Sequence, residues 1–260
     1  MDEAGTAAFR PGCTVSKIET DAATPVRALL QVSGLTKWYG DEIALADVAF
    51  DVNVREVLGV IGPNGAGKTT LLEAVAGLLP VDTGNITWRG APLPRARRRE
   101  FIFYLPDGIR PYQDQSVARV LAFFAGVYRR SGAHVAEIVA ALGLGSVLAK
   151  RVHALSKGFN RRLLLALALI APHPLVLMDE PFDGFDLRQS RAIGDVLRRI
   201  AQDGRALVLA IHQLGDAERV CDRFILLSGG RLRGQGTLTA LRQRTGLPAA
   251  GLEEVFLALT

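Results

Sequence analysis

Residues 57–70 read Val-Leu-Gly-Val-Ile-Gly-Pro-Asn-Gly-Ala-Gly-Lys-Thr-Thr, an apolar strand followed by a glycine-rich loop and a lysine. From Lys68 to Leu79 the pattern is that of a helix, which stops before Pro80. Gly62 to Thr69 fits G-x-x-x-x-G-K-[ST] between a strand and a helix, the context in which backbone N–H groups surround phosphate oxygens. The alternative, a glycine-rich turn with an incidental lysine, does not account for that context. We therefore predict a phosphate-binding loop.

The side chains and backbone of this loop have separate predicted tasks. The residues predicted to bind phosphate are Gly62, Pro63, Asn64, Gly65, Ala66, Gly67, Lys68, Thr69 and Thr70. The N-terminus of the following helix adds a partial positive charge. The Lys68 amine is expected to reach the β- and γ-phosphates, which makes it a candidate catalytic group, and the Thr69 hydroxyl is placed to bind Mg²⁺.

A second motif, Leu175-Val-Leu-Met-Asp-Glu-Pro181, ends an apolar strand in two acidic residues. Sheets of α/β proteins place their ligands at the carboxyl ends of strands. Asp179 is therefore predicted to hold Mg²⁺, and Glu180 to act as the general base that polarises the attacking water. An acidic pair after a strand is, taken alone, more often a helix cap. Together with the phosphate-binding loop, the metal and base interpretation is favoured.

Short apolar runs alternate with helical stretches along the rest of the chain. Strands are predicted at 28–32, 43–54, 57–61, 84–90, 175–178, 206–211 and 224–227. Helical stretches are predicted within 116–150 and at 160–170. The last three strands have no polar alternation, as expected of parallel strands covered on both faces. The predicted fold class is α/β, built around a mainly parallel sheet.

The composition raises the question of a membrane span. The 260 residues are 49% hydrophobic with a net charge of +5, and the mean hydropathy is +0.21. A spanning helix needs about 20 consecutive apolar residues, whereas the longest apolar run is Leu163 to Ala171. The N-terminus, with Asp2 and Glu3, lacks a secretory signal. We expect a cytoplasmic chain without a span, with 1–27 as a mobile tail and 28–260 as the folded domain.

The cysteines and an arginine run receive structural interpretations. Cys13 and Cys221 are too few and too far apart for a disulfide framework or a zinc cluster. The arginine-rich stretch 95–99 is expected to be a solvated turn, with contact to an anionic headgroup or to nucleic acid as the alternative. Neither feature contributes to the predicted site.

The order of the motifs resembles the nucleotide-binding subunits of ATP-binding cassette (ABC) transporters, over nearly the whole chain. Leu155-Ser-Lys-Gly-Phe159 stands where that family carries its LSGGQ signature, which completes the ATP site of the opposite subunit. The resemblance implies that Ser156 and Gly158 bind ATP across a dimer. Tyr39 corresponds to the aromatic residue that stacks on adenine. His212 corresponds to the switch histidine, which contacts the γ-phosphate and takes part in catalysis.

The resemblance also implies an architecture. It is a P-loop NTPase core with a mainly parallel sheet, an antiparallel β subdomain and an inserted α-helical subdomain at roughly 107–160. Residues 183–186, Asp-Gly-Phe-Asp, match the loop that runs along the dimer interface in that family. Two copies would close head to tail around two ATP molecules.

Three residues depart from the family pattern. Asp107 replaces a glutamine that touches Mg²⁺ and the attacking water, and its carboxylate is expected to bind the metal while altering metal affinity and coupling. Lys157 and Phe159 replace a glycine and a glutamine of the signature, and Lys157 is expected to add positive charge near the γ-phosphate. Because Ser156 and Gly158 remain, we expect ATP binding and hydrolysis to be retained.

The resemblance implies an ATPase with ATP and Mg²⁺ as cofactors, which drives transport through separate membrane-spanning permease subunits. The expected partners are those permeases and a second ATPase subunit, with a homodimer favoured, at the inner face of the cell membrane. Residues 211–223 and 252–257 look like those of efflux-type systems, which favours an exporter. An apolar groove around 112–128 is expected to receive a helix of the membrane partner.

Two alternatives remain open at this point. The first is a non-transport ABC ATPase acting on nucleic acid or ribosomes, but such proteins usually carry a second cassette, coiled coils or zinc modules. No nucleic-acid partner is therefore expected. The second is a small-molecule P-loop kinase, which leaves the signature-like segment and His212 unexplained.

Overall fold

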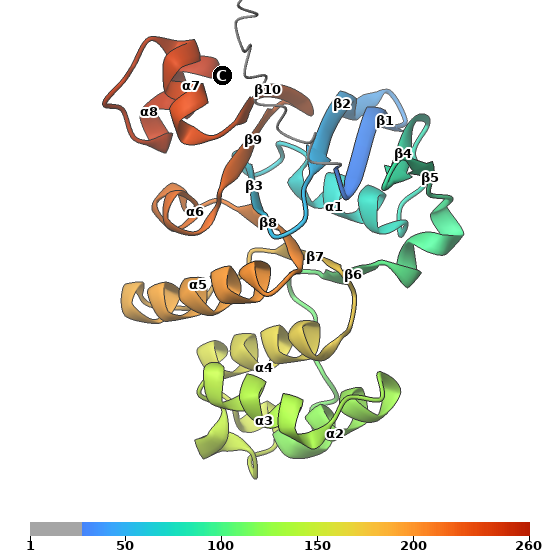
Figure 1. The fold of residues 1–260 in the computed structure, drawn as a ribbon, viewed down its shortest axis with the longest axis vertical. Coiled ribbons are helices and arrows are strands. Elements are labelled where there is room, and N and C mark those ends of the chain that lie inside the picture. Colours follow the sequence, from blue (N-terminus) through green and yellow to red (C-terminus); the bar gives the residue numbers. More distant parts are fainter. Residues whose placement is uncertain (1–27) are drawn as a thin grey trace, which may run out of the picture.

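A six-stranded sheet runs through the middle of the computed structural model, which describes residues 28–260 (Figure 1). The strand order is β10-β9-β3-β8-β7-β6, and all neighbours are parallel except β9 and β10. The strands are β3 (Val57–Ile61), β6 (Ile102–Leu105), β7 (Leu175–Asp179), β8 (Ala206–Ile211), β9 (Arg223–Ser228) and β10 (Arg231–Gly236). The predicted tail at 1–27, with Cys13, lies outside the described residues.

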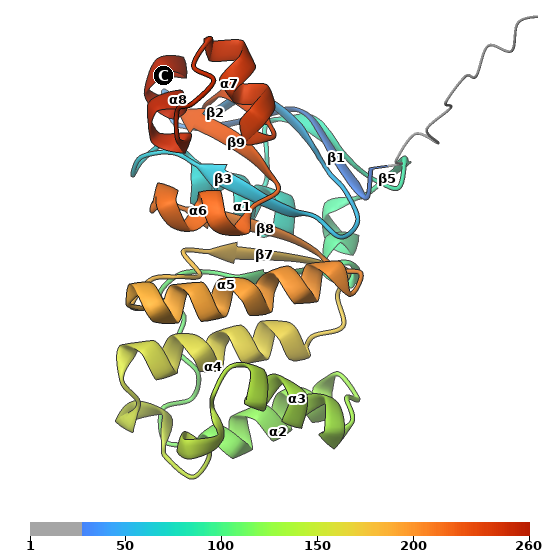
Figure 2. The same ribbon diagram turned by 60° about the vertical axis from the view of Figure 1, so that its left-hand side comes forward.

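Helices cover both faces of this sheet. The helix α1 (Lys68–Ala76) lies against one face, and α4, α5 and α6 lie against the other, with α2 and α3 packed beyond α4 (Figure 2). Their bounds are α2 (Val117–Val127), α3 (Gly132–Ala141), α4 (Lys157–Ile170), α5 (Leu187–Gln202), α6 (Leu214–Val220), α7 (Leu238–Thr245) and α8 (Leu252–Leu259), with 3₁₀ helices η2 (Gly145–Val147) and η3 (Val152–Ala154). No helix within residues 28–260 is long and apolar enough to cross a membrane.

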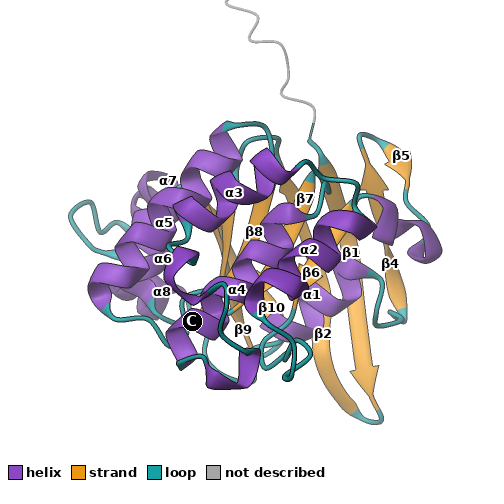
Figure 3. Ribbon diagram, turned by 90° about the horizontal axis from the view of Figure 1, so that it is seen from below, coloured by secondary structure: helices purple, strands orange, loops and turns teal. Residues whose placement is uncertain are grey.

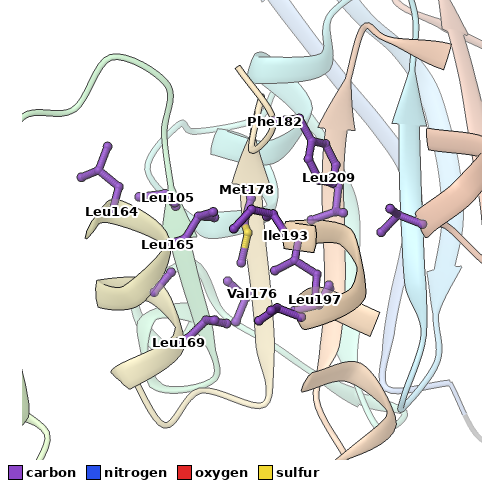
Figure 4. Packing of buried hydrophobic residues seen from close by; sticks show 14 of the residues in the cluster. Leu105, Leu164, Leu165, Leu169, Val176, Met178, Phe182, Ile193, Leu197 and Leu209 are labelled. Atoms are coloured by element: carbon purple, nitrogen blue, oxygen red, sulfur yellow. The ribbon is translucent and has the colours of Figure 1, made fainter. Parts of the chain in front are cut away.

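The central strands are buried on both faces, as their unbroken apolar runs predict. Every residue of β3, β7 and β8 is buried. Successive side chains of a strand point to opposite faces. Val176 and Met178 therefore join the core shared with α4 and α5 (Figure 4), whereas Leu175 and Leu177 join the core around α1. This double cover fixes the carboxyl ends of β3 and β7, where the predicted site begins.

A second, antiparallel sheet has the order β2-β1-β4-β5 and lies to one side of the central sheet (Figure 3). It contains β1 (Leu30–Tyr39), β2 (Glu42–Val52), β4 (Thr83–Trp88) and β5 (Ala91–Pro92). The first strand was predicted to end at Val32, which is wrong. Gly34, at φ 64°, interrupts the apolar alternation within an irregular stretch, and the strand then continues to Tyr39.

Two helix ends differ from the predicted ones for local reasons. The helix α1 ends before Leu79, because Gly77 adopts a left-handed conformation (φ 83°) that stops the helix. The helix α4 begins ahead of Asn160, because the Ser156 hydroxyl accepts a hydrogen bond from the Phe159 N–H and caps the helix. The signature-like segment is thus the first turn of α4.

The arginine run is exposed to solvent except at Arg98, as predicted, but it forms a 3₁₀ helix, η1 (Arg95–Glu100), rather than a turn. Arg98 is buried, and its Nη1 donates a hydrogen bond to the carbonyl oxygen of Ala74 at 2.6 Å. Arg95 Nε donates to the carbonyl oxygen of Gly77 at 2.7 Å. Both guanidinium groups therefore satisfy carbonyls at the C-terminus of α1 and oppose the negative end of its dipole.

Replacing Arg98 with methionine is expected to destabilise the protein. The variant leaves buried carbonyl oxygens without their charged donor, and the expected loss is about 1–3 kcal/mol in the free energy of unfolding. Urea denaturation followed by circular dichroism measures this loss. Arg99→Met, at an exposed position of the same helix, is the control and should change stability by less than about 0.5 kcal/mol. Equal stability of the two variants would contradict the prediction.

Candidate active site

The loop between β3 and α1 wraps around the side chain of Lys68. The Lys68 Nζ donates hydrogen bonds to the carbonyl oxygens of Gly62, at 2.8 Å, and Pro63, at 3.2 Å. A Cβ atom on Gly62 would lie 2.4 Å from the carbonyl oxygen of Leu227. Gly67 has φ 100°, a conformation that favours glycine. Both ends of the loop therefore require glycine, as the motif predicts.

A hydroxyl and a carboxylate meet beside this loop. Thr69 Oγ1 donates a hydrogen bond to Asp179 Oδ2 at 2.6 Å, which joins α1 to the end of β7. Asp179 is only 3% exposed, and this burial raises the pKa of its carboxyl group. Hydroxyl and carboxylate oxygens are ligands that Mg²⁺ takes at phosphate sites. The donor set at Thr69 and Asp179 therefore fits the predicted cation.

Three ionisable side chains converge next to this pair. Glu180 has a left-handed backbone (φ 49°), which is uncommon for a residue other than glycine. Its Oε2 lies 2.6 Å from Nδ1 of His212, and its Oε1 lies 4.0 Å from Nζ of Lys68. The neighbouring strands β7 and β8 thus deliver an acid and a histidine side by side, with the acid facing the lysine of the loop.

Glu180, Lys68 and the Thr69–Asp179 pair border one cavity of about 640 Å³, a volume typical of small-molecule sites. His212 does not line this cavity and reaches it only through its contact with Glu180. The predicted residues that line it are Tyr39, Asn64, Gly65, Gly67, Lys68, Thr69, Thr70, Asp107, Asp179 and Glu180. Tyr39 is 50% exposed, and the amine of Lys37 lies 5.4 Å from the centre of its ring. Gly62 and Ala66 are buried in the loop, so they shape it from behind rather than lining the cavity.

A family model described as ABC transporter matches residues 45–183, more than half of the chain. The chain belongs to the ABC transporter family. The ABC-type transporter ATP-binding protein EcsA of Bacillus subtilis is 31% identical over 240 residues, which cover 90% of this chain and 97% of EcsA. Nod factor export ATP-binding protein I of Rhizobium etli is 34% identical over 215 residues, which cover 80% and 67% of the two chains. A solved ATP-binding subunit of an ABC transporter superposes with a TM-score of 0.79 at 31% identity, covering 89% of this chain and 99% of that one.

This ABC protein is therefore the ATP-binding, ATP-hydrolysing subunit of a transporter, as predicted. The predicted α/β fold class is confirmed as well. The alternative of an ATPase acting on nucleic acid or ribosomes is not favoured. The roles of the individual side chains remain predictions. The cavity shows which of these side chains lie close together.

Asp107 lines this cavity of the ABC subunit, but its carboxylate already has a partner. Its Oδ1 accepts a hydrogen bond from Nη2 of Arg161, at 2.7 Å. Arg161 lies in the first turns of α4 and is buried. The predicted contact of Asp107 with Mg²⁺ would therefore compete with an ion pair that sequence reasoning did not include.

Ser156 and Gly158, predicted to bind ATP, do not line this cavity. They belong to the start of α4, where Ser156 caps the helix. Lys157, expected to add charge near the γ-phosphate, forms an ion pair with Asp183, with 2.9 Å between Nζ and Oδ2. A hydrogen bond from Lys157, together with the charge of its ammonium group, lowers the pKa of the Asp183 carboxyl group.

Sequence reasoning missed residues that line the cavity from the second sheet and from the β9–β10 turn. Ala44 and the pair Gly229 and Gly230 are among them. A Cβ atom on Gly230 would lie 2.7 Å from the carbonyl oxygen of Ala44, so glycine lets the turn approach β2 closely. The signal available in the sequence is the Gly-Gly pair that follows the apolar strand 224–227 after one serine.

Proposed function

We propose that this ABC subunit is the ATPase of an exporter whose membrane-spanning permeases are separate chains. Support comes from relatives named for export or resistance, namely the Nod factor export protein of Rhizobium etli and linearmycin resistance ATP-binding protein LnrL of Bacillus subtilis. The subunit would work at the cytoplasmic face of the membrane. Two copies would associate head to tail, so that Ser156 and Gly158 of one complete the ATP site of the other.

The observation that carries the proposed hydrolytic mechanism is the position of Glu180 between His212 and Lys68. Glu180 accepts a proton from the attacking water, and His212 orients its carboxylate. Lys68 and the loop N–H groups stabilise the charge that develops on the transferred phosphoryl group. Tyr39 stacks on the adenine ring.

Mg²⁺ would be held by Thr69 and Asp179, whereas the carboxylate of Asp107, the third ligand expected from the sequence, is already paired with Arg161. When bound, the cation neutralises charge on the β- and γ-phosphates. Thr69 Oγ1 and Asp179 Oδ2 share a hydrogen bond and therefore lie together. Both oxygens can act as ligands of the cation.

The proposed docking site for the permease is an apolar groove of about 540 Å³ on α2 and α4. Exposed side chains at its border include Tyr112 (69%) and Phe123 (68%), and Leu164 and Leu167 line it from α4. Solvent-exposed aromatic rings over an apolar floor favour burial against an apolar helix face. A membrane subunit that inserts a short cytoplasmic helix would supply that face.

Replacing Phe123 with aspartate is expected to reduce binding to the permease by at least about tenfold, because a charge would be buried in the apolar contact. The measurement is co-purification of membrane-spanning proteins with this chain from detergent extract. Leu257→Asp on α8 is the matched control, because Leu257 is equally exposed (69%) but lies outside the groove. Equal recovery of the permease with both variants would reject this groove as the docking site.

A further inference from the structure

Three segments that are far apart in the sequence meet around a second cavity, of about 310 Å³, beside the ATP cavity. They are the loop after β6, the first turn of α4 and the loop after β7. Each contributes charged side chains, and Asp107 lines both cavities. Two ion pairs, Asp107 with Arg161 and Lys157 with Asp183, connect the segments.

The first pair joins the loop after β6 to α4. The Arg161 side chain is 6% exposed and lies 2.7 Å from the Asp107 carboxylate. Its Nη1 is buried without a hydrogen-bond partner among the described residues. The Arg161 charge therefore depends on Asp107, because a buried cation without a counter-ion is strongly unfavourable. A glutamine at 107 would not supply that counter-ion.

The second pair joins α4 to the loop after β7. The aliphatic part of the Lys157 side chain packs against Gly184. A Cβ atom on residue 184 would lie only 2.9 Å from it, so glycine leaves room for the lysine. One turn further along α4, the guanidinium of Arg162 lies 5.8 Å from the ring centre of Phe159 and 5.7 Å from that of Phe185. These distances are within cation–π range.

Two of the departures from the family pattern, Asp107 and Lys157, therefore form ion pairs that join the start of α4 to neighbouring loops, whereas Phe159 contacts Arg162 within α4. We propose that Asp107 and Lys157 are positioning residues, which hold this turn, with Ser156, against the loops that frame the ATP cavity. The inference rests on the proposed function, in which this turn completes the ATP site of a second copy. In this view Lys157 acts through Asp183, rather than on the γ-phosphate.

A double-mutant cycle on the purified full chain tests the first pair. Asp107→Asn and Arg161→Met are each expected to reduce the kcat of ATP hydrolysis by about tenfold, because displacement of site groups costs rate even without loss of binding. The double variant should be no slower than the single variants, and the KM for ATP should be unchanged. Binding of a fluorescent ATP analogue checks that the subunit's own cavity is intact.

The exposed pair provides a second cycle that does not risk the fold. Lys157→Gln and Asp183→Asn should each reduce kcat by up to about fivefold, as suits a partly exposed ion pair. The Lys157→Arg variant should restore kcat. The matched control is the exposed pair Arg97 and Glu100 on η1, where Glu100→Gln should leave kcat unchanged.

Two results would overturn the proposal. One is additive loss of kcat in both cycles, which would mean that the paired residues act independently. The other is a higher Mg²⁺ concentration for half-maximal rate in Asp107→Asn but not in Arg161→Met, which would identify Asp107 as a metal ligand. A Ser156→Ala variant reports separately on the proposed function, because its full activity would contradict the shared site whatever the cycles show.

Discussion

Replacing Glu180 with glutamine is expected to reduce ATP hydrolysis by at least about a hundredfold, the contribution of a general base. The Glu180 carboxylate lies 2.6 Å from the ring of His212 and 4.0 Å from the amine of Lys68, at the border of the ATP cavity. Glutamine keeps the shape of the side chain but does not accept a proton from water. ATP binding should therefore be retained, and the dimer with bound ATP should persist.

Single-turnover hydrolysis and equilibrium binding of a fluorescent ATP analogue separate these two effects. The matched control is Glu253→Gln. Glu253 is an exposed glutamate on α8, far along the chain from the site, and this variant should hydrolyse ATP normally. Normal hydrolysis by the Glu180 variant would remove this residue from the mechanism. Loss of ATP binding would show that the carboxylate supports the cavity rather than the chemistry.

Replacing Lys68 with methionine is expected to weaken ATP binding by roughly 10- to 100-fold, the equivalent of one or two charge-assisted hydrogen bonds. The Lys68 side chain is nearly buried, and its amine is held by the carbonyl oxygens of Gly62 and Pro63. The loop therefore fixes the ammonium group before ATP arrives, so little freedom is lost when phosphate binds. Methionine has a similar length but no charge.

Isothermal titration with ATP measures this affinity directly. Lys150→Met, at an exposed position between η2 and η3, removes the same charge away from the cavity and should bind ATP as the unaltered chain does. A Lys68 variant that binds ATP with unchanged affinity would mean that the loop N–H groups alone account for phosphate recognition. A lower unfolding temperature of the Lys68→Met variant would reveal an additional structural role for the amine.

The central part of the fold could be predicted because its signals are local in the sequence. Continuous apolar runs at 175–178 and 206–211 predict buried parallel strands, and both are observed. The loop at 62–67 could be predicted from its glycines, since a Cβ atom on Gly62 or Gly67 would collide with neighbouring backbone. The acidic residues at the end of β7 follow from the rule that parallel strands expose their carboxyl ends at one edge of the sheet.

The ion pairs around the second cavity could not be predicted, because each joins segments that only the folded chain brings together. Asp107 and Arg161 belong to different elements, and nothing in the short motifs around them indicates that they meet. The same holds for Lys157 and Asp183. The length of β1 was underestimated for a different reason, since the irregular backbone at Gly34 hides the strand pattern that continues to Tyr39.

The hydroxyl of Ser156 accepts a hydrogen bond from the Phe159 N–H and so begins the helix α4. A hydroxyl carries one hydrogen and two lone pairs, so this cap leaves its hydrogen free to donate. The same oxygen can therefore cap the N-terminus of the helix as an acceptor and donate its hydrogen to an anion at the same time. Aspartate would cap the helix equally well but would repel a phosphate. Alanine would neither cap the helix nor donate a hydrogen bond to a phosphate. Serine at this position therefore meets the requirement of the fold and leaves a donor for the proposed contact with phosphate.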